Sequence, residues 1–360
     1  MRETLYSIFS SLPFCLCLFW WVLLMVRRKA VSYPAHRYLS VFAFTCTLLY
    51  FCHAAFFNGE EIPLLRVVYY LCHLAVYPLF WIYIRALTEP ELPPMRAGWV
   101  LLPSALTGIA LIVILACGGS PAQLDLPIRI LFMLQIIWVC VTGGRRLTAF
   151  DRKVKNFYVD TENKSLRSLR GLFFALILIS ILSTIAGALG RSAFLHGLIM
   201  IVPSALFSVL LFAIFHVGLL MEYTAVEMAS GSAEEARPAE DGDEDDRAQK
   251  ALLQRIQSLF ESQQMYLTPG LKITDVAEAL DTNRTYISAS INRQIGTSFS
   301  DYVNGFRVRH AQALLRRKDP ELTLTQIGIQ SGFSGDTSFF RNFKKVTGQT
   351  PSEWLVSQDA

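Results

Sequence analysis

Hydrophobic residues are distributed unevenly along this 360-residue chain. Long apolar stretches fill its first part, and shorter amphipathic patterns follow from about residue 248 onward. A helix that spans a membrane requires about 20 mainly apolar residues, because each residue rises about 1.5 Å through a hydrocarbon layer about 30 Å thick. Seven stretches meet this requirement and are predicted as spans: residues 5–26, 38–57, 64–87, 98–117, 127–144, 171–190 and 197–221.

The cationic residues between these stretches predict an orientation. Lys and Arg are retained on the cytoplasmic side when a protein inserts into a membrane. The first, third and fifth loops carry thirteen of these residues, eight of them in the fifth loop, whereas the opposite side has only Arg2 and Arg191. The pattern predicts an amino terminus on the outer side of the membrane and residues 222–360 in the cytoplasm.

Composition and charge agree with a division into three parts. The chain is 52% hydrophobic, with a mean hydropathy of +0.37, which argues against an ordinary single soluble domain. The formal charge of +4 divides into +9 for residues 1–221, −7 for 222–250 and +2 for 251–360. The acidic middle part is poor in apolar residues and is predicted to be a disordered, flexible linker.

Several ionisable residues lie within the predicted spans and are candidates for function, because polar groups are costly in lipid. The arginines lie near span ends, where long side chains can reach the interface, and the histidines show no recurrent metal-ligand spacing. A packing role is favoured, with proton sensing or ligand binding by one histidine as the alternative. No metal or cofactor is predicted. The residues are His53, His73, His216, Arg66, Arg85 and Arg129.

The last part of the chain contains an internal repeat. Residues 271–277 align with residues 322–328 at an offset of 51, and the offset becomes 52 after the intervening turn, where Ile287 matches Phe339 and Gly296 matches Gly348. Each copy shows the pattern of a short helix, a turn and a second helix, which is the plan of a helix-turn-helix. The predicted bounds are about 271–296 and about 322–348.

The second helix of each copy has one apolar and one polar face. In copy one, Ile287, Ile291 and Ile295 are predicted to be buried, and in copy two Phe339, Phe340, Phe343 and Val346. The opposite faces carry hydrogen-bonding and cationic side chains, which suit base edges and phosphates in a major groove. A solvated helix face is the simpler alternative for one copy, but two matched copies favour DNA. The predicted DNA-binding residues are Arg284, Thr285, Tyr286, Ala289, Asn292, Arg293, Thr337, Ser338, Arg341, Lys344 and Lys345.

Local signals predict how the copies begin, end and connect. Thr323 with Gln326 has the pattern of a capping box, and Asp336 is predicted to cap the helix after Gly335. A linker helix is predicted over about 299–317. Its eighteen or so residues would span roughly 27 Å, which would place the two reading helices about 34 Å apart, one turn of DNA.

Residues 251–360 carry a set of motifs: Val276-Ala277, Tyr286-Ile287-Ser288, Gly296-Thr297-Ser298-Phe299, Asn304, Arg307, Ala311, Leu314-Leu315, Ile327, Gly332-Phe333, Phe339, Arg341, Phe343-Lys344-Lys345, Gly348 and Thr350-Pro351. With these motifs the region resembles the DNA-binding domain of AraC/XylS-family transcription regulators, and its fusion to a multi-span bundle resembles the membrane-bound members of that family. The departures are Gly328, where the family usually has alanine, and Trp354-Leu355, where it often has tyrosine and arginine.

Together these patterns predict an all-α protein: a seven-span bundle over 1–221, an acidic linker over 222–250 and a tandem helix-turn-helix domain over 251–360. The favoured function is a transcription regulator of the bacterial inner membrane that binds double-stranded promoter DNA and uses the bundle as sensor or anchor. A second copy of the chain and RNA polymerase are candidate partners. The alternative is a transporter or receptor with a regulatory or protein-binding tail. Signature motifs of phosphate-binding loops, zinc proteases and kinases are missing, so no enzymatic activity is predicted.

Overall fold

The computed structural model describes residues 2–27, 34–57, 62–89, 94–160, 166–188, 201–230, 243–317, 319 and 321–358. These residues form helices and connecting segments without a β-strand, so the predicted all-α class is confirmed. The chain divides into two compact units. Unit 1 comprises Met1–Ala149 and Leu166–Ala229, and unit 2 comprises Phe150–Ser165 and Ser230–Ala360.

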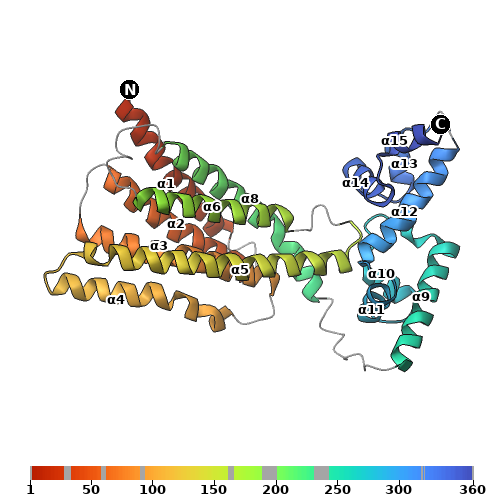
Figure 1. Ribbon diagram of the computed structural model, residues 1–360, viewed down its shortest axis with the longest axis horizontal. Coiled ribbons are helices and arrows are strands. Elements are labelled where there is room, and N and C mark those ends of the chain that lie inside the picture. Colours follow the sequence, from red (N-terminus) through yellow and green to blue (C-terminus); the bar gives the residue numbers. More distant parts are fainter. Residues whose placement is uncertain are drawn as a thin grey trace. The chain divides into compact units, whose positions relative to one another are not determined.

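Unit 1 is a bundle of long apolar helices (Figure 1). Within it α1 packs against α2, α2 against α3, and α3 against α4. Its described helices are α1 (Arg2–Arg27), α2 (Pro34–Phe57), α3 (Pro63–Thr88), α4 (Leu102–Ala116), α5 (Asp125–Phe157), α6 (Arg167–Ala188) and α8 (Ile201–Ser230), together with the 3-10 helices η1 (Pro94–Leu101) and η2 (Pro121–Leu124).

Six helical stretches of the described chain are long and apolar enough to cross a membrane. In the stretch in α3, 72% of the most apolar part is buried, which makes it the most enclosed of the six. The corresponding share is 28% in α5, α6 and α8, and 22% in the stretch that ends with α4. The outer helices therefore expose large apolar side chains, such as Leu106, Leu134 and Val209. Exposure of such a surface to water is unfavourable, whereas contact with the hydrocarbon of a membrane is not.

The predicted count of seven spans is not confirmed. A helix is present at each predicted position, but the apolar part of α1, Ser11–Arg27, is shorter than the six candidate spans. The structure also corrects the predicted ends, because α5 continues well beyond residue 144, to Phe157. Lys and Arg residues after residue 144 ended the apolar pattern but did not end the helix.

The prediction of a disordered linker over 222–250 is wrong at both ends. Helix α8 continues to Ser230, and α9 (Asp243–Gln263) begins within the predicted linker. The remaining residues, 231–242, lie outside the described residues.

The three histidines singled out from the sequence, His53, His73 and His216, contact aromatic rings. His73 stacks on Phe132 with ring centroids 3.8 Å apart, and His53 meets Tyr69 edge to face at 5.0 Å. His216 stacks with Phe212 at 6.2 Å. These contacts favour packing, the first of the two predicted roles.

The described residues of unit 2 form helices α9 to α15, and α12 joins its two halves. Helix α12 contacts α11 on one side and both α13 and α14 on the other, while α9 packs against α11. Besides α9, its elements are η3 (Met265–Leu267), α10 (Ile273–Ala279), α11 (Arg284–Ile295), α12 (Phe299–Arg316), α13 (Leu324–Gln330), α14 (Asp336–Thr347) and α15 (Pro351–Ser357).

The internal repeat is reproduced residue by residue in the helix bounds. Helices α10 and α13 have seven residues each and begin 51 residues apart, and α11 and α14 have twelve residues each and begin 52 residues apart. Both longer helices end at a glycine in the left-handed region, Gly296 with φ 74° and Gly348 with φ 80°. The backbone of the two copies therefore follows one plan.

The turn of copy two packs closely against η3. A Cβ atom on Gly332, whose φ is +86°, would lie 2.8 Å from backbone atoms of Leu267. The apolar core of copy two lies beneath this turn and includes Ile327, Phe333 and Phe339. Only glycine fits this contact, which fixes copy two against the segment that precedes copy one.

Candidate nucleic-acid interface

Helix α11 presents half of its predicted DNA-binding residues to solvent. Thr285, Asn292 and Arg293 are exposed, and Arg284, Tyr286 and Ala289 are partly buried. The opposite face is anchored by Ile287 and Ile291, which are fully buried as predicted. Ile295 is 44% exposed, so the prediction that it is buried is wrong. It is the last residue of the helix, where the apolar face runs past the core.

Helix α14 is the more cationic of the two. Thr337, Arg341, Lys344 and Lys345 are exposed. Two predictions of facing are wrong: Ser338 is buried, and Val346 is 51% exposed. The side chain of Ser338 accepts a hydrogen bond from Asn342 Nδ2 at 3.4 Å, and Asn342 is itself buried. Ser338 therefore belongs to the supporting side of the helix.

Side-chain caps fix where several of these helices begin. The Asn283 side chain accepts a hydrogen bond from Tyr286 N at the start of α11. The predicted capping box of Thr323 and Gln326 is present at the start of α13. The predicted cap by Asp336 is wrong, because Gly335 is the N-cap and Asp336 is the first helical residue, where its Oδ2 accepts from Thr325 Oγ1 at 3.0 Å.

Polar contacts tie α11 and α14 to their neighbours. Lys345 Nζ pairs with Asp301 Oδ1, which joins α14 to the start of α12. Gln294 Nε2 donates to Asp246 Oδ1 at 2.6 Å, which joins α11 to α9, and Asp246 also pairs with Lys250. These contacts are solvent-exposed, where water and salt screen charges, so they orient the helices more than they stabilise the fold.

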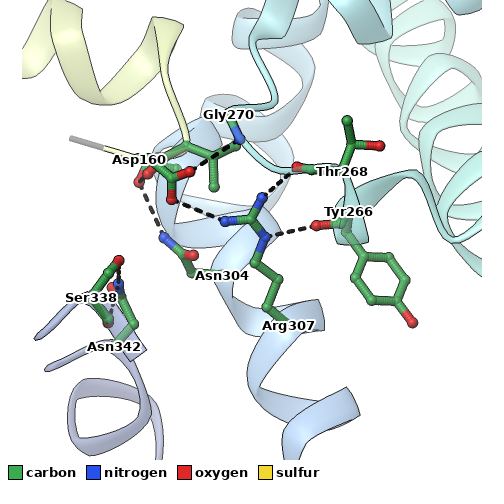
Figure 2. A network of polar contacts seen from close by, with 10 residues as sticks. Asp160, Tyr266, Thr268, Gly270, Asn304, Arg307, Ser338 and Asn342 are labelled. Carbon is green, nitrogen blue, oxygen red and sulfur yellow. Dashed lines mark hydrogen bonds and ion pairs between the residues drawn. The ribbon is translucent and has the colours of Figure 1, made fainter. Parts of the chain in front are cut away.

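A buried arginine lies at the centre of unit 2, and the sequence analysis did not assign it a role. Arg307 is fully buried; its Nε donates to Tyr266 O at 2.7 Å and its Nη2 to Thr268 O at 2.9 Å. Its Nη1 pairs with Asp160 Oδ1 at 3.0 Å (Figure 2). The spacing from Val303 and Ala311 places Arg307 on the buried stripe of α12, and this phase could have revealed it.

The electrostatics of this pair follow from its burial. Removal from water lowers the pKa of the Arg307 guanidinium, and the nearby Asp160 carboxylate opposes that shift. A guanidinium nevertheless stays protonated, so the positive charge persists inside the domain. A buried charge of this kind requires a partner of opposite charge and full hydrogen bonding.

Comparisons with known proteins agree with this geometry. Residues 276–356 match a family model described as a helix-turn-helix domain. An uncharacterized HTH-type transcriptional regulator of Staphylococcus aureus is 29% identical over 97 residues, which cover 27% of this chain and 13% of the relative. The Msm operon regulatory protein of Streptococcus mutans is 26% identical over 112 residues, covering 31% of this chain and 38% of the relative.

A solved structure of a Listeria innocua protein of unknown function is also similar. It shares 29% identity, covers 29% of this chain and 96% of its own length, and has a TM-score of 0.26. The repeated helices and the matched model define the second part of the chain as a tandem helix-turn-helix domain. Its predicted resemblance to the DNA-binding domain of AraC/XylS regulators is confirmed.

Proposed function

We propose that this chain is a membrane-anchored transcription regulator in which α11 and α14 read successive major grooves of promoter DNA. The observation that carries the proposal is the repeat of one helix-turn-helix with polar and cationic residues exposed on both second helices. The name of the Staphylococcus aureus relative supports regulation of transcription, and the comparisons favour a regulator over an enzyme.

The proposed contacts divide into two kinds. Arg293 and Arg341 have the planar, forked side chains that bind guanine edges, and we assign them to base reading. Lys344 and Lys345 lie near the end of α14 and are assigned to phosphates, which position the protein without reading sequence. Thr285, Asn292 and Thr337 are the exposed polar residues that complete the proposed surface.

Anchoring is proposed from the six apolar helices and the exposed apolar side chains of unit 1. DNA lies in the cytoplasm, so unit 2 is proposed to lie there, beneath a bacterial inner membrane. The amino terminus lies outside only if α1 crosses as a seventh span. Reporter fusions at both termini test these assignments; an exported carboxyl terminus would contradict them.

DNA binding can be tested on the full chain in lipid nanodiscs. Repeated selection from a random 40-base-pair duplex library should enrich one sequence, and footprinting should show two protected major-groove segments about 10 base pairs apart. Binding should weaken steeply with salt, because phosphate contacts release counterions. Absent enrichment, or binding that salt does not change, would favour a transporter or receptor whose tail binds protein.

A further inference from the structure

Residues 150–160 are packed as part of unit 2, although the sequence analysis placed them in the membrane bundle. They comprise the last eight residues of α5 and the three residues that follow. Within them Val154, Tyr158 and Val159 have almost no exposed surface, and Phe150 and Phe157 are also buried. A loop between two proposed spans has therefore become part of the DNA-binding unit.

The backbone of this segment pairs with the start of copy one. Tyr158 forms an antiparallel bridge with Lys272, and Val159 N donates to Leu271 O at 3.2 Å. On its other side Ser300 Oγ donates to Val159 O at 2.7 Å. Both backbone polar groups of Val159 are thus satisfied by residues that lie just before α10 and at the start of α12.

Asp160 completes the attachment through its charge. Its Oδ1 accepts from Arg307 Nη1, and its Oδ2 accepts from Gly270 N at 3.2 Å (Figure 2). Arg307 has no exposed surface, and its other described hydrogen bonds go to two neutral carbonyl oxygens. The segment therefore supplies the counter-charge that a buried guanidinium requires.

Phe157 reaches a residue of the proposed DNA surface. The guanidinium carbon of Arg284 lies 5.3 Å from the centroid of the Phe157 ring, within the range of a cation–π contact. Arg284 is the first residue of α11, and the amino-terminal residues of a recognition helix contact base edges in helix-turn-helix proteins. Docking of the segment and the proposed DNA binding thus both involve the Arg284 side chain.

We propose that residues 157–160 act as an intramolecular clasp that restrains copy one and withholds Arg284 from DNA, and that release of the clasp activates DNA binding. This inference rests on the proposed function. The clasp begins at the last residue of α5, and α5 contributes residues to both units, so movement of α5 is the proposed route by which the bundle controls DNA binding.

A reversible cross-link tests the restraint in the full chain. Cα atoms of paired antiparallel residues lie about 4.5–5.5 Å apart, which a disulfide can bridge, so the pair Tyr158→Cys and Lys272→Cys should cross-link on oxidation. In nanodiscs, the oxidised protein should bind the enriched duplex at least tenfold more weakly than the reduced protein. Each single variant, which retains the seven native cysteines, should show no such difference.

Release of the clasp tests the opposite direction. Asp160→Ala and Phe157→Ala should each bind the enriched duplex about fivefold more tightly than the natural chain, and Phe157→Ala does so with the Arg307 ion pair intact. Asp319→Ala is the matched control, because it removes an exposed carboxylate of the same unit and should change binding less than twofold. Release variants that bind no more tightly than Asp319→Ala would overturn the proposal.

The two proposals fail in different ways. If no duplex is enriched, the proposed function is wrong. If a duplex is enriched but the oxidised and reduced double variants bind it within twofold of each other, the clasp is wrong and the function stands. Failure of the double variant to cross-link would overturn the docking itself, since cross-linking needs no DNA.

Discussion

The two helix-turn-helix copies share one backbone plan but differ at the residues that fix their helices. Copy one has Ala277 where α10 and α11 cross and Asn283 as a side-chain cap, whereas copy two has Gly328 and Gly335. A Cβ on Gly328 would lie 3.0 Å from the Phe339 ring, so glycine allows a large aromatic residue to pack close to α13. The same helix arrangement is thus reached with different core residues.

The exposed faces differ as well, and this difference suggests separate roles. At matching positions copy one has Ala289 and Asn292 where copy two has Arg341 and Lys344. Copy two therefore offers the stronger electrostatic contact with DNA. Copy one carries the residue that Phe157 engages, Arg284. We infer that copy two anchors the protein on DNA and that copy one is the regulated reader.

The largest predicted effect on stability comes from truncating a large buried side chain in the core of one copy. Ile287 and Phe339 occupy matching positions and are both fully buried. Phe339→Ala should destabilise copy two by about 3–5 kcal/mol and Ile287→Ala should destabilise copy one by about 2–5 kcal/mol, because each leaves a cavity. Hydrogen exchange of the full chain should show faster exchange first in the helix that carries the change. Equal acceleration in α11 and α14 would show that the copies unfold as one.

Loss of one arginine that we propose to read bases should have the next largest effect. Arg341→Ala should weaken binding of the enriched duplex by about 1–3 kcal/mol and binding of random DNA by less, since base contacts carry specificity. Anisotropy titrations of the full chain with both duplexes measure this. Arg309→Ala, an exposed cation on α12, is the control. An equal loss on both duplexes would assign Arg341 to phosphate binding.

Arg293→Ala sharpens the comparison between the copies. In the natural chain the clasp restrains copy one, so this change should cost less binding energy than Arg341→Ala. Combined with Phe157→Ala, which leaves the pair of Arg307 and Asp160 intact, it should cost as much, about 1–3 kcal/mol. The same titrations measure both backgrounds, and a loss that does not depend on Phe157 would remove the distinction drawn between the copies.

Lys344→Ala should act on affinity without changing specificity. Loss of one phosphate contact should weaken binding to all duplexes and lower the slope of log affinity against log salt by about 0.9. A salt series with enriched and random DNA tests this, with Arg309→Ala as the control. An unchanged slope would place Lys344 away from the phosphates.

The smallest effects concern the helix caps. Asn283→Ala should destabilise copy one by about 1 kcal/mol, since the side chain satisfies a backbone N–H at the start of α11. Gly335→Asn should stabilise copy two by a few tenths of a kcal/mol. Gly335 has extended backbone, with φ 174°, and nothing lies within 4 Å of an added Cβ. Thermal unfolding, monitored by hydrogen exchange in α11 and α14, measures both changes in stability. A Gly335→Asn variant less stable than the natural chain would contradict the argument about the cap.

The sequence predicted the features that depend on hydrophobic periodicity and on the internal repeat. The all-α class, the paired helices and the offsets of 51 and 52 follow from local patterns of apolar, glycine and capping residues. Facing was predicted correctly in the middle of α11 and α14 and wrongly for Ile295, Ser338 and Val346, because the core covers a different arc at the helix ends and beginnings.

Tertiary contacts explain the other differences. Helix α5 continues through a basic sequence to Phe157, and its last residues pack within unit 2. No local pattern reveals that Asp160 meets Arg307, since 147 residues separate them. The position of Arg307 on the apolar stripe of α12 implies that a buried counter-charge is needed. The residue that supplies this charge can be identified only from the folded structure.

Genome-wide mapping of DNA that cross-links to the full chain in isolated membranes is the most direct test of the central claim. We predict discrete promoter sites in the membrane fraction, each with two recognition segments one helical turn apart, and their loss in the Arg293→Ala, Arg341→Ala double variant. Recovery of the same DNA with the double variant, or of none with the natural chain, would contradict the claim that a membrane-anchored tandem helix-turn-helix reads DNA.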